Sequence, residues 1–197
     1  KNFPKEKRPE IYLENRQSQN IQTLLKKVKL IKKKFITVAP SSVWETKKMP
    51  KEKFIDLIHL ILQKTKFNVA LIGSNSDIPL TESIQKKFNN RVVNLSGMTN
   101  LAELAFVIKE SVAVISNDSS PIHFASAFNI PTIAIFGATI PDFGYTPLSD
   151  KNFISEITGL PCRPCGIHGG KSCPEKHFHC MEHQIPEKIF QNLQTLL

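Results

Sequence analysis

Hydroxyl, carboxylate and lysine side chains suited to phosphate binding gather at two places in the chain. In the first, residues 112–127, an apolar run gives way to Asp118, Ser119 and Ser120 before a helical pattern opens at Pro121. Proline suits the first turn of a helix, and either serine is a ready N-cap. The pattern predicts a helix N-terminus pointed at the carboxyl edge of a sheet, where phosphates bind in open α/β folds. The alternative is an ordinary capped helix in which Asp118 satisfies its own turn.

The second place follows an apolar run at residues 35–40. Ser41 and Ser42 come directly after it, and Lys47 precedes the next helical pattern. Short hydroxyl donors, free backbone N–H groups and a mobile ammonium are the groups that bind phosphate. Alone, this loop is a weak signal, because a lysine before a helix is usually just solvated. Together, the two loops predict a phosphate site at one sheet edge.

A stretch rich in cysteine and histidine covers residues 160–183. Its thiols follow the pattern C-x2-C-x7-C-x6-C and belong to Cys162, Cys165, Cys173 and Cys180. This spacing allows a tetrahedral zinc site; reduced structural thiols and two disulfides are the other interpretations. We expect no secretory leader, which ranks disulfides last. The cluster is expected to be structural and remote from turnover.

The elements that must position these residues alternate along the chain. Apolar runs predict strands at 35–40, 68–72, 92–95, 112–115 and 132–136, and helical patterns cover 50–64, 81–88, 100–109, 121–128 and 187–197. Continuous apolar strands alternating with helices predict a Rossmann-like α/β fold, a parallel sheet with helices on both faces.

Size and charge limit the possible classes. With 197 residues, 41% hydrophobic and 22% charged, the chain is typical of one globular domain. No apolar run reaches the length of a membrane span. Residues 1–34 hold eleven Lys/Arg against three Glu and supply most of the net charge of +9. This block lacks the interleaved aromatic residues of a single-strand binder, so nucleic acid is not expected as a partner. A solvated linker and helix, or attraction to an anionic membrane, are its interpretations.

We therefore expect a basic linker and helix over 1–34 and a Rossmann-like domain over 35–197, including the 160–183 stretch and a C-terminal helix. Residues 116–125, with Ile-Pro-Thr-Ile-Ala-Ile-Phe-Gly-Ala-Thr at 130–139, resemble the nucleotide-sugar-binding signature of glycosyltransferase family 9. These are the heptosyltransferases of lipopolysaccharide core synthesis and their relatives. Ser120 stands where the family usually has Gly, so strain would follow if this position needs a positive φ.

The resemblance implies a set of donor-site residues. Residues 40–50 resemble the family loop that carries a phosphate-contacting lysine, here Lys47, although Lys48 and Met49 replace the usual Arg and Trp. The implied phosphate and sugar contacts are Ser41, Ser42, Lys47, Asp118, Ser119, Ser120, His123 and Thr139. The implied nucleoside contacts are Gly73, Asn75, Gly97 and Met98, with Asp77 as a second candidate for the ribose. Polar turns, a structural histidine and plain packing of methionine are the competing interpretations.

The resemblance also implies a function. Family 9 enzymes are of the GT-B type, and this chain resembles their carboxyl half, which holds the nucleotide sugar. The implied reaction is inverting transfer of a sugar from ADP-heptose to a lipopolysaccharide-core or related glycolipid, in the cytoplasm or on the inner face of the inner membrane. No cofactor is required for transfer, because lysine and a helix dipole take the role of Mg²⁺. The catalytic base is expected in an amino half, with Asp142 as the alternative.

Two rival functions are a non-catalytic nucleotide-binding module and a zinc-dependent nucleic-acid-binding protein.

Overall fold

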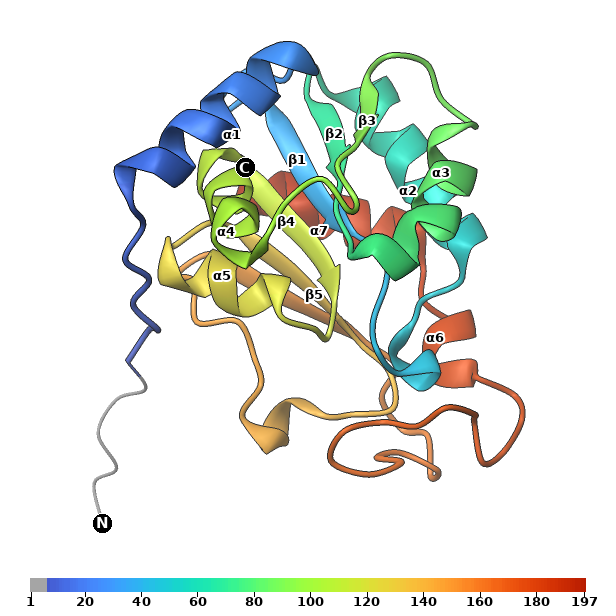
Figure 1. Ribbon diagram of the computed structural model, residues 1–197. Coiled ribbons are helices and arrows are strands. Elements are labelled where there is room, and N and C mark those ends of the chain that lie inside the picture. The colour runs from blue at the N-terminus through green and yellow to red at the C-terminus, as the bar shows by residue number, and fades with distance from the viewer. Residues whose placement is uncertain (1–6) are drawn as a thin grey trace.

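A single parallel sheet forms the centre of the computed structural model, which describes residues 7–197 (Figure 1). Within that range the strand order is β3-β2-β1-β4-β5-β6. The strands are β1 (Phe35–Ala39), β2 (Asn68–Leu71), β3 (Val92–Asn94), β4 (Ala113–Asn117), β5 (Thr132–Phe136) and β6 (Asn152–Glu156). The predicted α/β fold with a parallel sheet is confirmed.

Burial on both faces explains why the central strands read as continuous apolar runs. All five residues of β1, β4 and β5 are buried. One row of paired positions crosses the sheet through Leu71, Val38, Ile115, Ile133 and Phe153. The first four belong to the core cluster on one face and Phe153 packs against it; their sequence neighbours point to the other face.

Helices cover both faces of the sheet (Figure 1). The helices are α1 (Asn15–Lys27), α2 (Lys51–Lys64), α3 (Ile78–Gln85), α4 (Leu101–Glu110), α5 (Pro121–Ala127), α6 (His179–Glu182) and α7 (Pro186–Leu196), with short turns η1 (Glu45–Lys47), η2 (Asn75–Asp77) and η3 (Pro141–Phe143). Helices α1, α4 and α5 lie on one face, and α2, α3 and α7 on the other. No helix within residues 7–197 combines the length and hydrophobicity of a membrane span.

Helix α1 packs beside α4 on one face of the sheet. Ile21 and Leu25 are buried in the same core cluster as α4 residues such as Phe106. The connection from α1 to β1 exposes Lys29, Lys32 and the lysines that follow, at the amino end of β1. Residues 1–6 of the predicted basic linker lie outside the described residues.

Strand β6 is absent from the sequence-based prediction, which is wrong at this point. Its sequence, Asn-Phe-Ile-Ser-Glu, has polar residues at both ends, and only Ser155 is buried. As an edge strand it pairs with β5 alone, for example Ile133 with Phe153. An edge strand needs no continuous apolar run, so the signal that identifies β1, β4 and β5 is missing here.

The strand order produces a switch point between β1 and β4. The chain leaves β1 toward the face of α2 and leaves β4 toward the face of α5. In open α/β sheets a crevice forms at the carboxyl ends of two such neighbouring strands. Both phosphate-suited loops follow these two strands.

Candidate functional site

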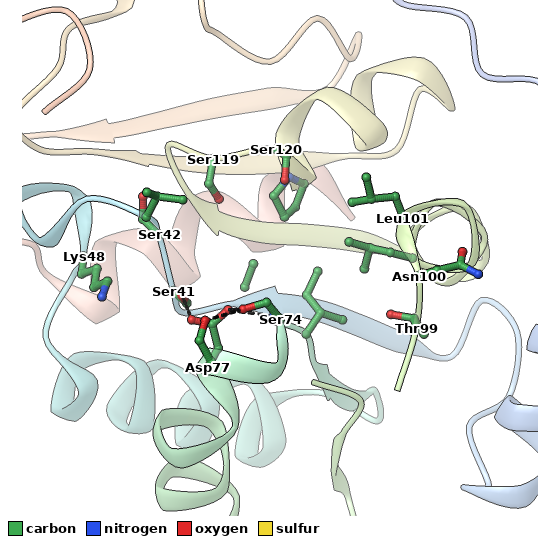
Figure 2. Close-up of a pocket in the computed structure, with 17 residues that line it drawn as sticks. Ser41, Ser42, Lys48, Ser74, Asp77, Thr99, Asn100, Leu101, Ser119 and Ser120 are labelled. Carbon is green, nitrogen blue, oxygen red and sulfur yellow. Dashed lines mark hydrogen bonds between the residues drawn. The ribbon is translucent and has the colours of Figure 1, made fainter. Parts of the chain in front are cut away.

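A pocket of about 780 Å³ opens at this switch point (Figure 2). Loops that follow β1, β2, β3 and β4 all contribute to its wall, and hydroxyl groups are frequent among them. The hydroxyl-bearing residues of the wall are Ser41, Ser42, Ser74, Ser76, Thr99, Ser119 and Ser120. A pocket of this size and composition suits a ligand as large as a nucleotide.

Two charged residues, Asp77 and Lys48, line the pocket. Ser41 Oγ donates to Asp77 Oδ1, and the backbone N–H and hydroxyl of Ser74 each donate to Asp77 Oδ2 at 2.7 Å (Figure 2). Burial raises the pKa of Asp77, but these hydrogen bonds and the Lys48 charge outweigh burial and leave the pKa below its ordinary value. Asp77 is therefore a carboxylate that favours hydroxyl donors and repels phosphate.

The opposite side of the pocket is better suited to an anion. Ser119 and Ser120 lie across the pocket from Asp77, and Ser42 lies on their side (Figure 2). Their hydroxyls are neutral donors. The pocket therefore has a carboxylate on one side and neutral hydroxyl donors on the other.

A second polar cluster forms beside these loops. Lys47 Nζ lies 2.5 Å from Asp118 Oδ2, and Thr139 Oγ1 donates to the same oxygen at 2.7 Å. The side chains of Lys47 and Asp118 are only 10% and 4% exposed. Burial lowers the pKa of His123; the Asp118 charge opposes this shift and the Lys47 charge reinforces it. The Lys47 ammonium, which was expected to be mobile, is therefore buried and paired with Asp118.

The predicted residues fall into three groups. Six of them line the pocket: Ser41, Ser42, Gly73, Asp77, Ser119 and Ser120. Lys47, Asp118 and Thr139 form the polar cluster. His123 lies close enough for the charges of this cluster to affect its pKa. Asn75, Gly97 and Met98 do not line the pocket. Met98 lines a smaller hollow of about 330 Å³ with residues of α1 and α4.

Gly97 has a structural role between two loops. Its φ is +73°, and a Cβ there would collide with the Asn75 side chain. Its N–H donates to Gly73 O at 3.0 Å. Gly97 and Asn75 therefore fix the loops after β2 and β3, one of which contributes Gly73 to the pocket wall.

Two expectations for the loop after β4 need correction. Ser120 precedes α5, but its side chain makes no capping hydrogen bond. Ser119 Oγ instead donates to Asn117 O at 3.2 Å. The φ of Ser120 is −52°, in the right-handed region, so the strain considered for a replaced glycine does not arise.

Asn117, which the sequence analysis passed over, joins the two loops. Its side chain is fully buried. Asn117 Nδ2 donates to Pro40 O at 2.9 Å, and its Oδ1 accepts from the N–H of Met49 at 3.2 Å. The signal was an amide at the end of an otherwise apolar strand, because a buried amide must find partners.

The cysteine-rich stretch contains four free thiols. Burial raises the pKa of the Cys165 and Cys180 thiols, which keeps them protonated. Among the described residues no group of three or more His, Cys, Asp or Glu side chains is placed to hold a metal ion. The zinc hypothesis therefore finds no support, disulfides are absent from the described cysteines, and reduced structural thiols match the structure.

The cysteine-rich stretch contacts the turn that carries Lys47 and the loop after β5. The N–H of Thr46, in η1, donates to Gly170 O at 3.1 Å, and the N–H of Gly170 donates back to Thr46 Oγ1 at 2.7 Å. The N–H of Cys165 donates to Ala138 O at 2.8 Å, next to Thr139. Long-range backbone contacts of this kind leave no pattern in the sequence.

Asp142, the alternative base, lies exposed in η3.

Comparison with known proteins gives the family. The model of "Glycosyltransferase family 9 (heptosyltransferase)" matches residues 1–179. A lipooligosaccharide heptosyltransferase 2 of Haemophilus influenzae is 36% identical over 115 residues, which cover 56% of this chain and 33% of that protein. The lipopolysaccharide heptosyltransferase 2 of Escherichia coli is 32% identical over 156 residues, covering 77% of this chain and 43% of that protein.

The fold agrees with a solved relative. The E. coli ADP-heptose lipopolysaccharide heptosyltransferase II superposes with a TM-score of 0.76 and 23% identity, over 98% of this chain and 55% of that chain. This chain thus spans less than half the length of the two curated relatives. Because the family model covers most of the sequence, the chain belongs to glycosyltransferase family 9.

Proposed function

We propose that this chain is the donor-binding half of a heptosyltransferase-like glycosyltransferase and binds a nucleotide sugar in the pocket between β1 and β4. The observation that supports this most is the convergence of four strand-end loops, rich in hydroxyl groups, on one pocket at the switch point. ADP-heptose is the proposed donor, because the solved relative is described by that donor.

The Asp77 carboxylate on one side of the pocket and the hydroxyl groups on the other orient the donor. The ribose hydroxyls face the Asp77 carboxylate, which accepts hydrogen bonds. The diphosphate lies toward Ser42, Ser119 and Ser120; Lys48, whose ammonium pairs with Glu45, also lines the pocket. Hydrogen-bond donors that are already in position there stabilise the negative charge that develops on the diphosphate as it leaves the sugar.

The buried polar cluster completes the diphosphate end. Lys47 directly precedes Lys48, and Asp118 directly precedes Ser119. Lys47 and Asp118 form a buried ion pair, and in this proposal Asp118 keeps the Lys47 ammonium in position while the diphosphate interacts with the same ammonium. Thr139 holds Asp118 in place through its hydrogen bond at 2.7 Å, and His123 lies near this pair. Of the expected nucleoside contacts, Asn75 and Gly97 act indirectly by fixing the loops after β2 and β3, whereas Met98 lines a separate hollow.

The transfer reaction needs more than this chain. A general base must lie within hydrogen-bond reach of the acceptor hydroxyl, and we place it in an amino half that faces the pocket. Val43 and Leu101, both at the pocket, are 89% and 69% exposed. Such apolar side chains suit contact with a facing half. We propose inverting transfer to a glycolipid acceptor, without a metal cofactor.

The basic α1–β1 connection supports a location on the cytoplasmic face of an anionic membrane.

Calorimetric titration of residues 1–197 with ADP, UDP and GDP tests the proposed donor site. ADP is expected to bind more tightly than UDP and GDP. Equal binding of all three nucleotides would contradict the ADP assignment. Absence of binding by all three would overturn the donor site itself.

A further inference from the structure

Arg163, in the cysteine-rich stretch, makes four side-chain hydrogen bonds near the site. Its side chain is 6% exposed. Its guanidinium donates to Gly137 O, to Ile157 O at 2.8 Å, and to Thr139 O and Glu156 Oε2 at 2.7 Å each. Glu156 ends β6 and balances the buried positive charge.

These contacts fix the loop after β5 almost atom by atom. Three consecutive carbonyls, those of Gly137, Ala138 and Thr139, are each held from the same stretch, the middle one by the N–H of Cys165 at 2.8 Å. On its other side, the N–H of Ala138 donates to Thr46 O at 3.3 Å, in the turn that carries Lys47. The loop is therefore held between the cysteine-rich stretch and η1.

The backbone of Thr139 determines where its hydroxyl points. That hydroxyl donates to the Asp118 oxygen that also pairs with Lys47. We propose that Arg163 is a positioning residue of the donor site: by fixing Thr139, it holds Asp118 and, through Asp118, Lys47. This inference rests on the proposed donor site and extends it to a residue that does not touch the donor.

The chemistry at this position requires arginine. Its planar guanidinium presents five N–H donors in fixed directions, and here these donors meet four separate acceptors. A lysine ammonium has three donors on one atom and cannot reach the same set. Arg163→Lys therefore keeps the charge that balances Glu156 but loses most of the contacts with the loop.

Arg91 provides a matched control. It also donates to three backbone carbonyls, those of Leu62, Thr65 and Phe67, at 2.7–3.0 Å. Arg91 lies just before β3, at the amino edge of the sheet and opposite the pocket. Removing either arginine costs stability, but only Arg163 is connected to the polar cluster.

The experiment measures ADP affinity by calorimetry and melting temperature for wild type, Arg163→Ala, Arg163→Lys, Arg91→Ala and Thr139→Val. We expect Arg163→Ala and Arg163→Lys to weaken ADP binding about tenfold, and Arg91→Ala to change it less than about twofold at a similar loss of melting temperature. Adding Thr139→Val to Arg163→Lys should weaken binding little further, because both changes act through one hydroxyl.

The outcomes separate the two proposals. If wild type binds no ADP, the donor site itself is wrong. If wild type binds ADP and both Arg163 variants bind it equally well, or Arg91→Ala weakens binding as much as they do, the positioning role is overturned. Should Arg163→Ala fail to fold, Arg163→Lys and its combination with Thr139→Val decide the question alone.

Discussion

Lys47 and Asp118 form a buried ion pair at the end of two loops. Removing one partner leaves the other charge unpaired, which typically costs about 3–5 kcal/mol of stability. We expect Lys47→Ala to lower the free energy of unfolding by roughly this amount and to weaken ADP binding by about 1.5–3 kcal/mol. Urea unfolding and calorimetry measure the two effects.

Lys64→Ala, at the exposed far end of α2, is the control and should change neither quantity appreciably. An unchanged ADP affinity in Lys47→Ala would remove Lys47 from the donor site.

Asp77 makes stability depend on pH. Because the folded-state pKa of Asp77 lies below its ordinary value, the ionised carboxylate stabilises the fold above about pH 4. That contribution disappears as the pH falls through the lower folded-state pKa. We therefore expect the free energy of unfolding to fall more between pH 7 and pH 3 in wild type than in Asp77→Asn. Equal losses in the two proteins would show that the hydrogen bonds from Ser41 and Ser74 do not favour the charged form.

At the scale of elements, Asn117 connects the end of β4 to both ends of the loop after β1. We expect Asn117→Leu to destabilise the fold by about 1–3 kcal/mol for each backbone group left unpaired. Trp44, the single tryptophan, lies in this loop and reports on it by fluorescence. The emission of Trp44 should already differ in the folded variant, at temperatures below its melting transition. The control is Asn192→Ala, which removes an exposed hydrogen bond on α7; a native emission spectrum in Asn117→Leu would contradict the connection.

The cysteine-rich stretch should behave as a set of reduced thiols. Cys173 and Cys180 are buried, and Cys162 and Cys165 are partly exposed. Alkylation of the native chain should therefore label Cys162 and Cys165 first. Cys173 and Cys180 should react only when the chain unfolds. Elemental analysis should find no stoichiometric zinc, and a chelator should leave the melting temperature unchanged. One zinc per chain would restore the metal hypothesis.

Elements buried on both faces were predictable from the sequence, and contacts between distant loops were not. Strands such as β1, β4 and β5 show their apolar runs directly, and the loops that follow β1 and β4 carry recognisable phosphate chemistry. The pairing of Lys47 with Asp118 and the role of Arg163 depend on segments more than 20 residues apart. Hydrogen bonds to backbone carbonyls leave no trace in residue type, so these features required the structure.

At the scale of the molecule, we expect the isolated chain to bind ADP and transfer no sugar. The pocket supplies groups for the donor, but a base for the acceptor hydroxyl is expected from an amino half. Adding the amino half of a relative, fused or in trans, should restore transfer, measured as acceptor-dependent release of ADP. Release by residues 1–197 alone would place the base in this half, and Asp142→Asn would be the first variant to test. A restored complex that binds donor and acceptor but never turns over would favour a non-catalytic nucleotide-binding module.

The α1–β1 connection, which carries the exposed lysines, lies at the top of Figure 1, at the amino end of β1 and so at the opposite edge of the sheet from the pocket. Because parallel strands all run the same way, this separation gives the chain a polarity along the strand axis. An anionic surface that attracted these lysines would orient the chain with its pocket facing away into the surrounding water. A glycolipid would then have to present its outermost sugar, rather than its lipid, at the height of the pocket. Distance from the surface would in this way select acceptors by the length of the glycan they already carry.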